Sequence, residues 1–436
     1  MAPVSEDTFG FDKILAPAIY YAENGFPVGE ITSRSWNVPT VTKLLAEQGN
    51  AKATFLMDGV RGPRFGEIFK NPDLGKSLRR IAEKGRDGYY LGPTAEAILA
   101  TEKEAGGTMT AADLAEYQPE WVTPIKTTYH GWTVYELPPN SQGIAALSML
   151  NLMEQFPLAE YGFHSPRALH VMIEAKKLAY ADLVQYIGDP RFAKMPVEQM
   201  LDKQRAAQRA KLIQPAQAQC TVKPAEYDGV TNAIGNDTIY LTVIDREGNI
   251  VSLIQSNYSA FGSGLVPAGT GFVLHNRGGL FSIKPNQPNT LTPRHRPLHT
   301  IIPAFMEKDG VRIGFGIMGG WNQAQAHAQF VANVVDYGMT IQQALEAGRF
   351  TKTTFPGCDV EIEELVPEST REALTKLGHE LTVIPRRSSI FGWGQAVMSD
   401  TKGVHYGASE PRHDGMAIPE TAPVFGAGAA SSTSSH

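Results

Sequence analysis

The sequence predicts an α+β protein in which strands stacked in sheets are covered by helices. Up to about residue 213, apolar residues recur mainly at spacings of three and four, the period of amphipathic helices. A weakly periodic segment rich in turn-forming residues follows at 214–237, and β-rich runs begin at residue 238. Two more helical stretches close the core. This order suits layered sheets and helices better than an alternating parallel βαβ series.

Short links separate the helical segments of the first half. We expect helices at 14–24, 41–48, 95–103 and 167–186. From residue 131 the chain alternates apolar and polar residues and then breaks at Pro138 and Pro139. That pattern is typical of a strand that leads into a loop.

The second half carries the predicted sheet strands. Two runs, 238–245 and 249–257, are joined by a short polar turn that ends in Gly248, which predicts a β-hairpin. We also expect strands at 271–274, 299–306 and 311–317, and helices at 324–337 and 340–347. Thr340 is the expected N-cap of the last helix. The low-complexity end, 426–436, is expected to be disordered.

Composition excludes several classes of protein. Of 436 residues, 42% are hydrophobic and 19% charged, which indicates a folded chain. Lys plus Arg number 39 against 45 for Asp plus Glu, a net charge of −6, so we expect no nucleic-acid partner. No run approaches the ~18 apolar residues of a membrane span, so no membrane partner is expected. As written, the chain lacks a signal-peptide pattern, which favours the cytoplasm.

Cysteines and histidines form no recognisable metal site. Cys220 and Cys358 fit neither a disulfide framework nor a paired-cysteine site, and we interpret both as incidental thiols. Four histidines of the second half lack the helix spacing and acidic partner of a zinc site, and we expect them in the core or in solvent: His275, His295, His299 and His327. No metal or organic cofactor is predicted.

Thr238 is the first candidate for chemistry. It opens a strand at the end of the connector. If the chain were cut before it, one residue would carry both a hydroxyl nucleophile and an α-amine with a pKa of roughly 7.7–8.0 that can act as a base. A threonine at the start of a strand is also an ordinary structural feature.

A glycine-rich turn is the second candidate. Gly319 and Gly320 lie between a predicted strand and a predicted helix. Backbone N–H groups in such a turn can stabilise an oxyanion, although a tight strand-to-helix turn has the same pattern. A phosphate loop is disfavoured because its Lys-Ser/Thr ending is missing.

Together these stretches resemble the γ-glutamyltranspeptidase family of N-terminal-nucleophile hydrolases. The match runs from Leu15 to about Gly415. The motifs that carry it are Leu15-Ala-Pro-Ala-Ile, Asn24-Gly-Phe-Pro-Val, Gly92-Pro-Thr-Ala-Glu-Ala-Ile, Leu137-Pro-Pro-Asn-Ser-Gln-Gly, Glu174-Ala-Lys-Lys-Leu-Ala-Tyr-Ala-Asp182, Asp237-Thr238, Asp245-Arg-Glu-Gly-Asn-Ile-Val-Ser, Phe261-Gly-Ser-Gly, Gly319-Gly320, Asp336-Tyr-Gly-Met and Tyr406-Gly-Ala-Ser-Glu-Pro-Arg.

The resemblance implies a four-layer αββα sandwich made as an inactive precursor. The precursor would cut itself between Asp237 and Thr238 into a large-subunit portion, 1–237, and a small subunit, 238–436, which stay together as a heterodimer or a dimer of heterodimers. Thr238 would then attack substrate amides through an acyl-enzyme. By the same resemblance, Ser256 positions this nucleophile, and Gly319 and Gly320 form the oxyanion hole.

Departures from the family pattern bear on the substrate. Glutathione-cleaving members carry an acidic pair that holds the substrate's α-ammonium group, and Gly279 and Leu280 stand there in this sequence. Tyr258 replaces a glutamyl-binding Asn, and His299 and Thr300 replace the Ser pair that receives the α-carboxylate. An unpaired buried ammonium is costly, so a small acid amide is favoured, as in oxamate amidohydrolases. Cephalosporin-acylase-like relatives and γ-glutamyl transfer with glutathione hydrolysis remain as alternatives.

The start of the chain also departs from the pattern. The family's large subunit opens with core strands, a helix, a glycine-rich loop and an arginine that pairs with the substrate carboxylate. The sequence begins after the corresponding stretch. We therefore expect an exposed sheet edge and exposed apolar core. Two alternatives follow: a non-catalytic truncated member, and a periplasmic or secreted protein whose natural start lies upstream.

Overall fold

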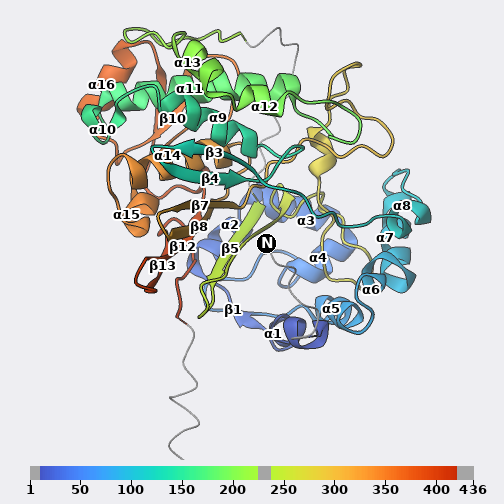
Figure 1. Ribbon diagram of the computed structural model, residues 1–436. Helices are drawn as coiled ribbons and strands as arrows, with labels where there is room; N and C mark the ends of the chain where they lie inside the picture. The colour runs from blue at the N-terminus through green and yellow to red at the C-terminus, as the bar shows by residue number, and fades with distance from the viewer. Residues whose placement is uncertain (1–9, 224–236, 420–436) are drawn as a thin grey trace, which may run out of the picture.

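An antiparallel sheet of six strands forms the centre of the molecule (Figure 1). The computed structural model describes residues 10–223 and 237–419, so the expected disordered end and most of the connector lie outside the described residues. The strand order is β13-β12-β8-β7-β4-β3. The bounds are β3 (Ile125–Tyr129), β4 (Trp132–Glu136), β7 (Ala304–Lys308), β8 (Val311–Ile317), β12 (Gly394–Ser399) and β13 (His405–Ser409).

The sheet joins the two parts of the chain that flank the expected cleavage point. Strands β3 and β4 precede residue 237, and the other four follow it. The junction is the pairing of β4 with β7, in which Thr133 lies opposite Glu307. Neither part therefore forms the sheet alone.

A hairpin packs against one face of this sheet. It consists of β5 (Asp237–Ile244) and β6 (Ile250–Tyr258), the expected pair of strands. Glycines at alternate positions of β8 let the hairpin approach closely. A Cβ atom on Gly316 would lie 2.5 Å from the ring of Tyr240, and one on Gly314 would lie 2.5 Å from Ile250. The intervening residues of β8 face the helices.

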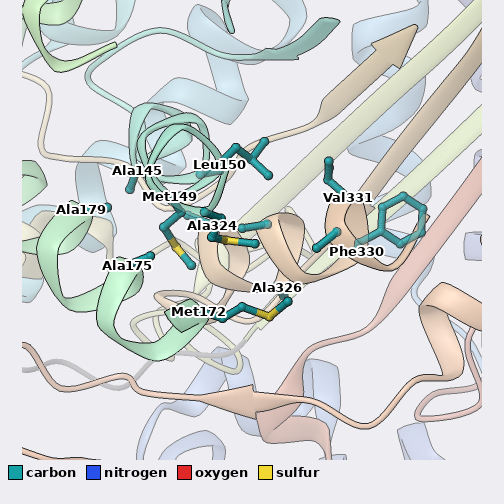
Figure 2. Packing of buried hydrophobic residues seen from close by; sticks show 14 of the residues in the cluster. Ala145, Met149, Leu150, Met172, Ala175, Ala179, Ala324, Ala326, Phe330 and Val331 are labelled. Atoms are coloured by element: carbon teal, nitrogen blue, oxygen red, sulfur yellow. The ribbon is translucent and has the colours of Figure 1, made fainter. Parts of the chain in front are cut away.

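The opposite face of the sheet is covered by helices with small side chains at their contacts. In α9 (Gly143–Met153) all eleven residues are buried, and α11 (Pro166–Tyr186) and α14 (Asn322–Val335) pack beside it. Figure 2 shows alanines from all three helices interleaved with Met149, Met172 and Phe330. Small residues at these positions allow close helix packing. The main core therefore lies between the sheet and these helices.

The other helices extend this core or form a second cluster. The N-terminal helices pack with the loop that follows β6, where the side chain of Asn71 donates to the Gly271 carbonyl at 2.7 Å. Their bounds are α1 (Phe11–Asn24), α2 (Glu30–Trp36), α3 (Pro39–Glu47), α4 (Gly49–Phe55), α5 (Pro72–Lys84), α6 (Asp87–Tyr90), α7 (Gly92–Glu104) and α8 (Ala111–Ala115). The remaining elements are α10 (Leu158–Tyr161), α12 (Val197–Met200), α13 (Lys203–Ala210), α15 (Ile341–Glu346), α16 (Glu368–Lys376), β1 (Phe26–Pro27), β2 (Ile68–Phe69), β9 (Phe350–Thr351), β10 (Asp359–Glu363) and β11 (Glu380–Ile384).

The outward face of the hairpin is apolar and exposed. Alternate residues of β5, beginning with Ile239 at 55% exposure, point away from the sheet, whereas Thr238 and Tyr240 are buried. The exposed members of this face are Ile239, Leu241, Val243, Val251 and Leu253. The outward face of the hairpin is therefore an exposed apolar surface.

Of the strands predicted from the sequence, one does not form and another begins later than predicted. Residues 271–274 form a loop, because the backbone of Leu274 bonds to the preceding loop at Leu265 and Ser263. The strand expected at 299–306 begins only at Ala304. The backbone of His299 instead bonds to Asn140 and Gln142, and Pro303 has no N–H to donate.

The interpretation of the cysteines as incidental thiols is also wrong. Cys220 and Cys358 form a disulfide, with their Cα atoms 4.6 Å apart. They are 138 residues apart in sequence, so no local spacing signals the pairing. Only the folded chain brings Cys220, in the described part of the connector (214–223), to the start of β10.

Among the described residues, no helix combines the length and apolar character needed to cross a membrane.

Candidate active site

Thr238 and Ser256 face each other at one end of the hairpin. They are register partners on β5 and β6, and a register shift lies between residues 237 and 238. Thr238 is 6% exposed. Its hydroxyl donates to Ser256 Oγ at 2.9 Å. This contact fixes the direction of the Thr238 side chain, as a nucleophile requires.

Ser256 is held by two further donors. The Tyr258 backbone N–H donates to its Oγ at 2.9 Å, and the Arg277 guanidinium donates at 2.8 Å. Arg277 lies in the short 3-10 helix η1 (Arg277–Leu280), in the loop after β6. The hydroxyl next to the candidate nucleophile is therefore bonded directly to a cation.

Arg277 is a buried cation whose partners are hydroxyl groups. It is 3% exposed, and its second terminal nitrogen donates to Thr300 Oγ1 at 2.8 Å. Its guanidinium carbon lies 5.0 Å from the centre of the Tyr258 ring. Burial lowers the pKa of Arg277 to about 10, so the group is still charged at neutral pH. Among the described side chains, those of residues 10–223 and 238–419, no carboxylate lies within ion-pair distance of it.

The structure places the expected substrate-binding residues around this cation. Tyr258 is buried beneath the guanidinium, and Thr300, with no exposed surface, accepts from it. His299 is partly buried, and burial followed by the charge of Arg277 lowers its pKa to about 3. Leu280 packs into the main core and brings no charge to the site.

The expected oxyanion glycines form the turn from β8 into α14. Gly319 and Gly320 have φ angles of 126° and 57°, which favour glycine. A Cβ atom on Gly319 would lie 3.2 Å from Cβ of Asn322. The Asn322 backbone N–H donates to the Gly319 carbonyl at 2.9 Å, so the turn continues directly into the helix.

Gln142 connects this turn to the cation. Its side-chain amide donates to the carbonyls of both Thr300, at 2.5 Å, and Gly320, at 2.8 Å, and the residue has no exposed surface. Thr300 in turn accepts from Arg277. A continuous set of hydrogen bonds therefore runs from Thr238 to the glycine turn.

Sequence reasoning missed Arg277 and Gln142 as site residues. Arg277 belongs to Asn276-Arg-Gly-Gly279, which reads as a glycine turn. The signal that could have indicated it is a charged residue directly before two glycines, close to the position where the family's acidic pair is replaced. Gln142 lies within the family motif Leu137-Pro-Pro-Asn-Ser-Gln-Gly, but no neighbouring residue indicates its two carbonyl partners.

One group in the described part of the chain has the composition of a metal site. His170, Glu174 and His379 offer ligand atoms within 4.8 Å of one another, and all three are buried. Their atoms already bond to protein groups, with His170 Nδ1 2.8 Å from His379 Nε2 and Glu174 Oε1 2.7 Å from Lys177 Nζ. We interpret the group as a hydrogen-bonded core cluster. His379 is 209 residues from His170, so no local histidine spacing indicates this group.

His379 is expected to make folding sensitive to acid. Burial, reinforced by the charge of Lys177, lowers its pKa to about 3, whereas an unfolded histidine titrates near 6.5. Between these values the unfolded chain binds more protons, so the free energy of unfolding falls as pH falls. The contribution of His379 is about 1.4 kcal/mol per pH unit. Denaturant unfolding of wild type and His379→Gln at pH 6, 5 and 4 should show a shallower pH dependence in the variant, and equal slopes would contradict this.

The fold and the site together define an N-terminal-nucleophile hydrolase. The second residue of a strand, in a hairpin stacked on a helix-covered sheet, carries a hydroxyl that bonds to a second hydroxyl. A series of hydrogen bonds connects this pair to a glycine turn. The family model of gamma-glutamyltranspeptidase matches residues 8–420. The chain belongs to the gamma-glutamyltranspeptidase family of enzymes, as the sequence predicted.

Known relatives support this assignment. A glutathione hydrolase-like proenzyme of Bacillus subtilis is 36% identical over 409 residues, covering 93% of this chain and 76% of the relative. An oxamate amidohydrolase proenzyme of Klebsiella pneumoniae is 31% identical over 411 residues, covering 93% and 75%. The crystal structure of cephalosporin acylase from Bacillus halodurans superposes with a TM-score of 0.81 at 37% identity, covering 94% of this chain and 74% of the other. The predicted fold class is thereby confirmed.

Proposed function

We propose that the protein is a self-processed amidohydrolase that uses Thr238 as its nucleophile and acts on a small amide bearing a carboxylate, of which oxamate is the simplest example. The observation that carries this proposal is the buried cation of Arg277, which has hydroxyl partners and no acidic partner among the described side chains of residues 10–223 and 238–419. Relatives named as proenzymes, including the oxamate amidohydrolase, support the processing and the reaction type.

The first reaction would be cleavage of the chain itself. Thr238 Oγ1 attacks the carbonyl carbon of residue 237, and the peptide nitrogen leaves as the α-amine of Thr238. Water then hydrolyses the resulting ester. The products are a fragment of 237 residues and one of 199 residues that begins with Thr238. These are the two units into which we propose to divide the chain.

The second reaction would use the new α-amine as the base. It accepts the Thr238 hydroxyl proton while Oγ1 attacks the substrate amide, and ammonia leaves from the acyl-enzyme. Gly319 and Gly320 would stabilise the oxyanion through backbone N–H groups. Water then releases the acid and restores Thr238. Ser256, which accepts the hydroxyl in the uncut chain, would keep Oγ1 in place.

The charge of the site favours an anion over an ammonium group. An unpaired buried charge costs several kcal/mol, and a substrate carboxylate would remove this cost at Arg277. The α-ammonium of a γ-glutamyl group would instead meet this cation without the acidic pair, since Gly279 and Leu280 supply no charge. The same residues therefore favour oxamate and disfavour glutathione.

A substrate comparison tests the proposal. Purified, processed protein should release ammonia from oxamate with kcat/KM at least 100-fold above that for a γ-glutamyl-anilide, because about 3 kcal/mol separates a paired from an unpaired buried charge. Ammonia release and aniline release are measured on the same preparation at pH 8. A γ-glutamyl rate far above the oxamate rate would support γ-glutamyl transfer instead. Absence of turnover with every amide would favour a non-catalytic member of the family.

A further inference from the structure

The disulfide Cys220–Cys358 connects the two sides of the proposed cleavage point. Cys220 lies before the Asp237–Thr238 junction, and Cys358 lies after it. No other cysteine occurs in the chain. Cleavage would therefore turn a cross-link within one chain into a bond between two fragments.

We propose that this disulfide is a covalent tether that keeps the processed protein as one linked molecule, and that its reduction converts the molecule into a dissociable pair of fragments. The inference rests on the proposed self-cleavage for the identity of the fragments. The pairing of the cysteines themselves is independent of cleavage.

The backbone around Cys220 docks onto the later part of the chain. The N–H of Gly357 donates to the Cys220 carbonyl at 2.9 Å. Two residues earlier, the N–H of Ala218 donates to the Leu377 carbonyl at 2.7 Å. Hydrogen bonds on the same segment thus hold Cys220 beside its partner.

A buried ion pair holds the same segment from its other side. Lys177 donates to the Gln219 carbonyl at 3.0 Å and to Glu174 at 2.7 Å, and both charged side chains are at most 2% exposed. These residues lie on α11 of the large-subunit portion. Residues 218–220 of the connector are therefore held between α11 and the loop that contains Cys358.

The two sulfur-bearing residues differ in exposure, which allows redox control. Cys358 is 2% exposed, and Cys220 belongs to the exposed residues. A small thiol can attack from the Cys220 side by thiol–disulfide exchange. Two thiol molecules give up two electrons and two protons to the protein disulfide, which yields two protein thiols and one small disulfide. Oxidation by a small disulfide is the reverse reaction.

The tether would matter because the fragments share one sheet. The β4–β7 pairing, the packing of α9 on α14 and the packing of α11 on α16 hold the fragments together without a covalent bond. A tether keeps the second fragment at a high effective concentration whenever this interface opens. Without it, the stability of the processed protein depends on its concentration.

Denaturing electrophoresis with and without reductant tests the tether. Processed wild type should run as one species near 47.4 kDa without reductant and as two bands with it. Cys358→Ser should give two bands under both conditions. The matched control is Thr238→Ala, which keeps both cysteines and should give one band under both conditions.

The outcomes separate the tether from the cleavage. Two wild-type bands without reductant would overturn the tether and leave the cleavage intact. One wild-type band under both conditions would instead overturn the cleavage. Peptide mapping of the unreduced protein tests whether the disulfide is present. A linked peptide pair containing Cys220 and Cys358 is expected whether or not the chain is cut.

A second measurement reports the effect of the tether on the folded protein. The thermal midpoint of unreduced, processed wild type should not change with protein concentration. After reduction, the midpoint should rise with concentration over a 100-fold range, as expected for a complex that dissociates on unfolding. A reduced protein whose midpoint is equally insensitive to concentration would contradict a dissociable pair.

Discussion

Thr238→Ala is expected to leave the protein as a single uncut chain under reducing conditions and to abolish amide hydrolysis. The variant lacks the hydroxyl that would attack both the carbonyl of residue 237 and the substrate. It also never exposes the α-amine that would serve as base. Because one residue would supply both groups, a loss of at least about 10⁴-fold in kcat is expected.

Two further variants make this result specific. Thr238→Ser keeps a hydroxyl at the same place and should still process, although more slowly. Thr242→Ala removes a threonine from the same strand whose hydroxyl donates to the Val251 carbonyl, and it should process and turn over normally. Reducing electrophoresis and ammonia release are measured for all three. If the Thr238→Ala chain were still cleaved, Thr238 could not be the nucleophile of the self-cleavage.

Arg277→Gln is expected to lower kcat/KM for oxamate about 100-fold, mainly through KM. The change removes the buried positive charge that we propose as the partner of the substrate carboxylate. Hydrogen bonds to charged groups contribute about 1.5–3 kcal/mol, and the upper value corresponds to about 100-fold. Arg277→Lys keeps the charge but loses the two-pronged contact with Ser256 and Thr300, so an intermediate loss is expected.

A neutral substrate separates the two roles of Arg277. An amide of the same size without a carboxylate, such as acetamide, gains nothing from the cation. If Arg277 binds the carboxylate, the Gln variant should lose much more activity toward oxamate than toward this amide. An equal loss toward both would mean that Arg277 acts only by holding Ser256, and would refute carboxylate binding.

Local sequence patterns predicted the elements whose structure depends on local interactions. The strand expected at 311–317 is β8 with the same bounds. The expected cap at Thr340 is confirmed, because its side chain accepts from the Gln343 backbone and Gln343 bonds back to it. By contrast, residues 271–274 have strand-like composition but bond to a neighbouring loop. Whether such a segment pairs in a sheet depends on distant partners.

In the site, too, contacts between residues close in sequence could be predicted, whereas contacts between distant residues could not. Thr238 and Ser256 are 18 residues apart on one hairpin, and the family resemblance identified both. Gln142 reaches Gly320 across 178 residues, and the two cysteines meet across 138. No local spacing encodes such contacts. These contacts follow from the strand order of the central sheet. The sequence predicted stacked layers but did not predict that order.

The position of β4 beside β7 also has a consequence for biosynthesis. Thr133 cannot pair with Glu307 until the ribosome has added more than 170 further residues. The edge of β4 that pairs with β7 therefore stays without its partner strand during this part of synthesis. Ser256, Arg277 and Thr300 likewise emerge only after Thr238. Peptide-bond cleavage would thus be delayed until the downstream sheet has formed. Only chains that have finished folding would then be cleaved.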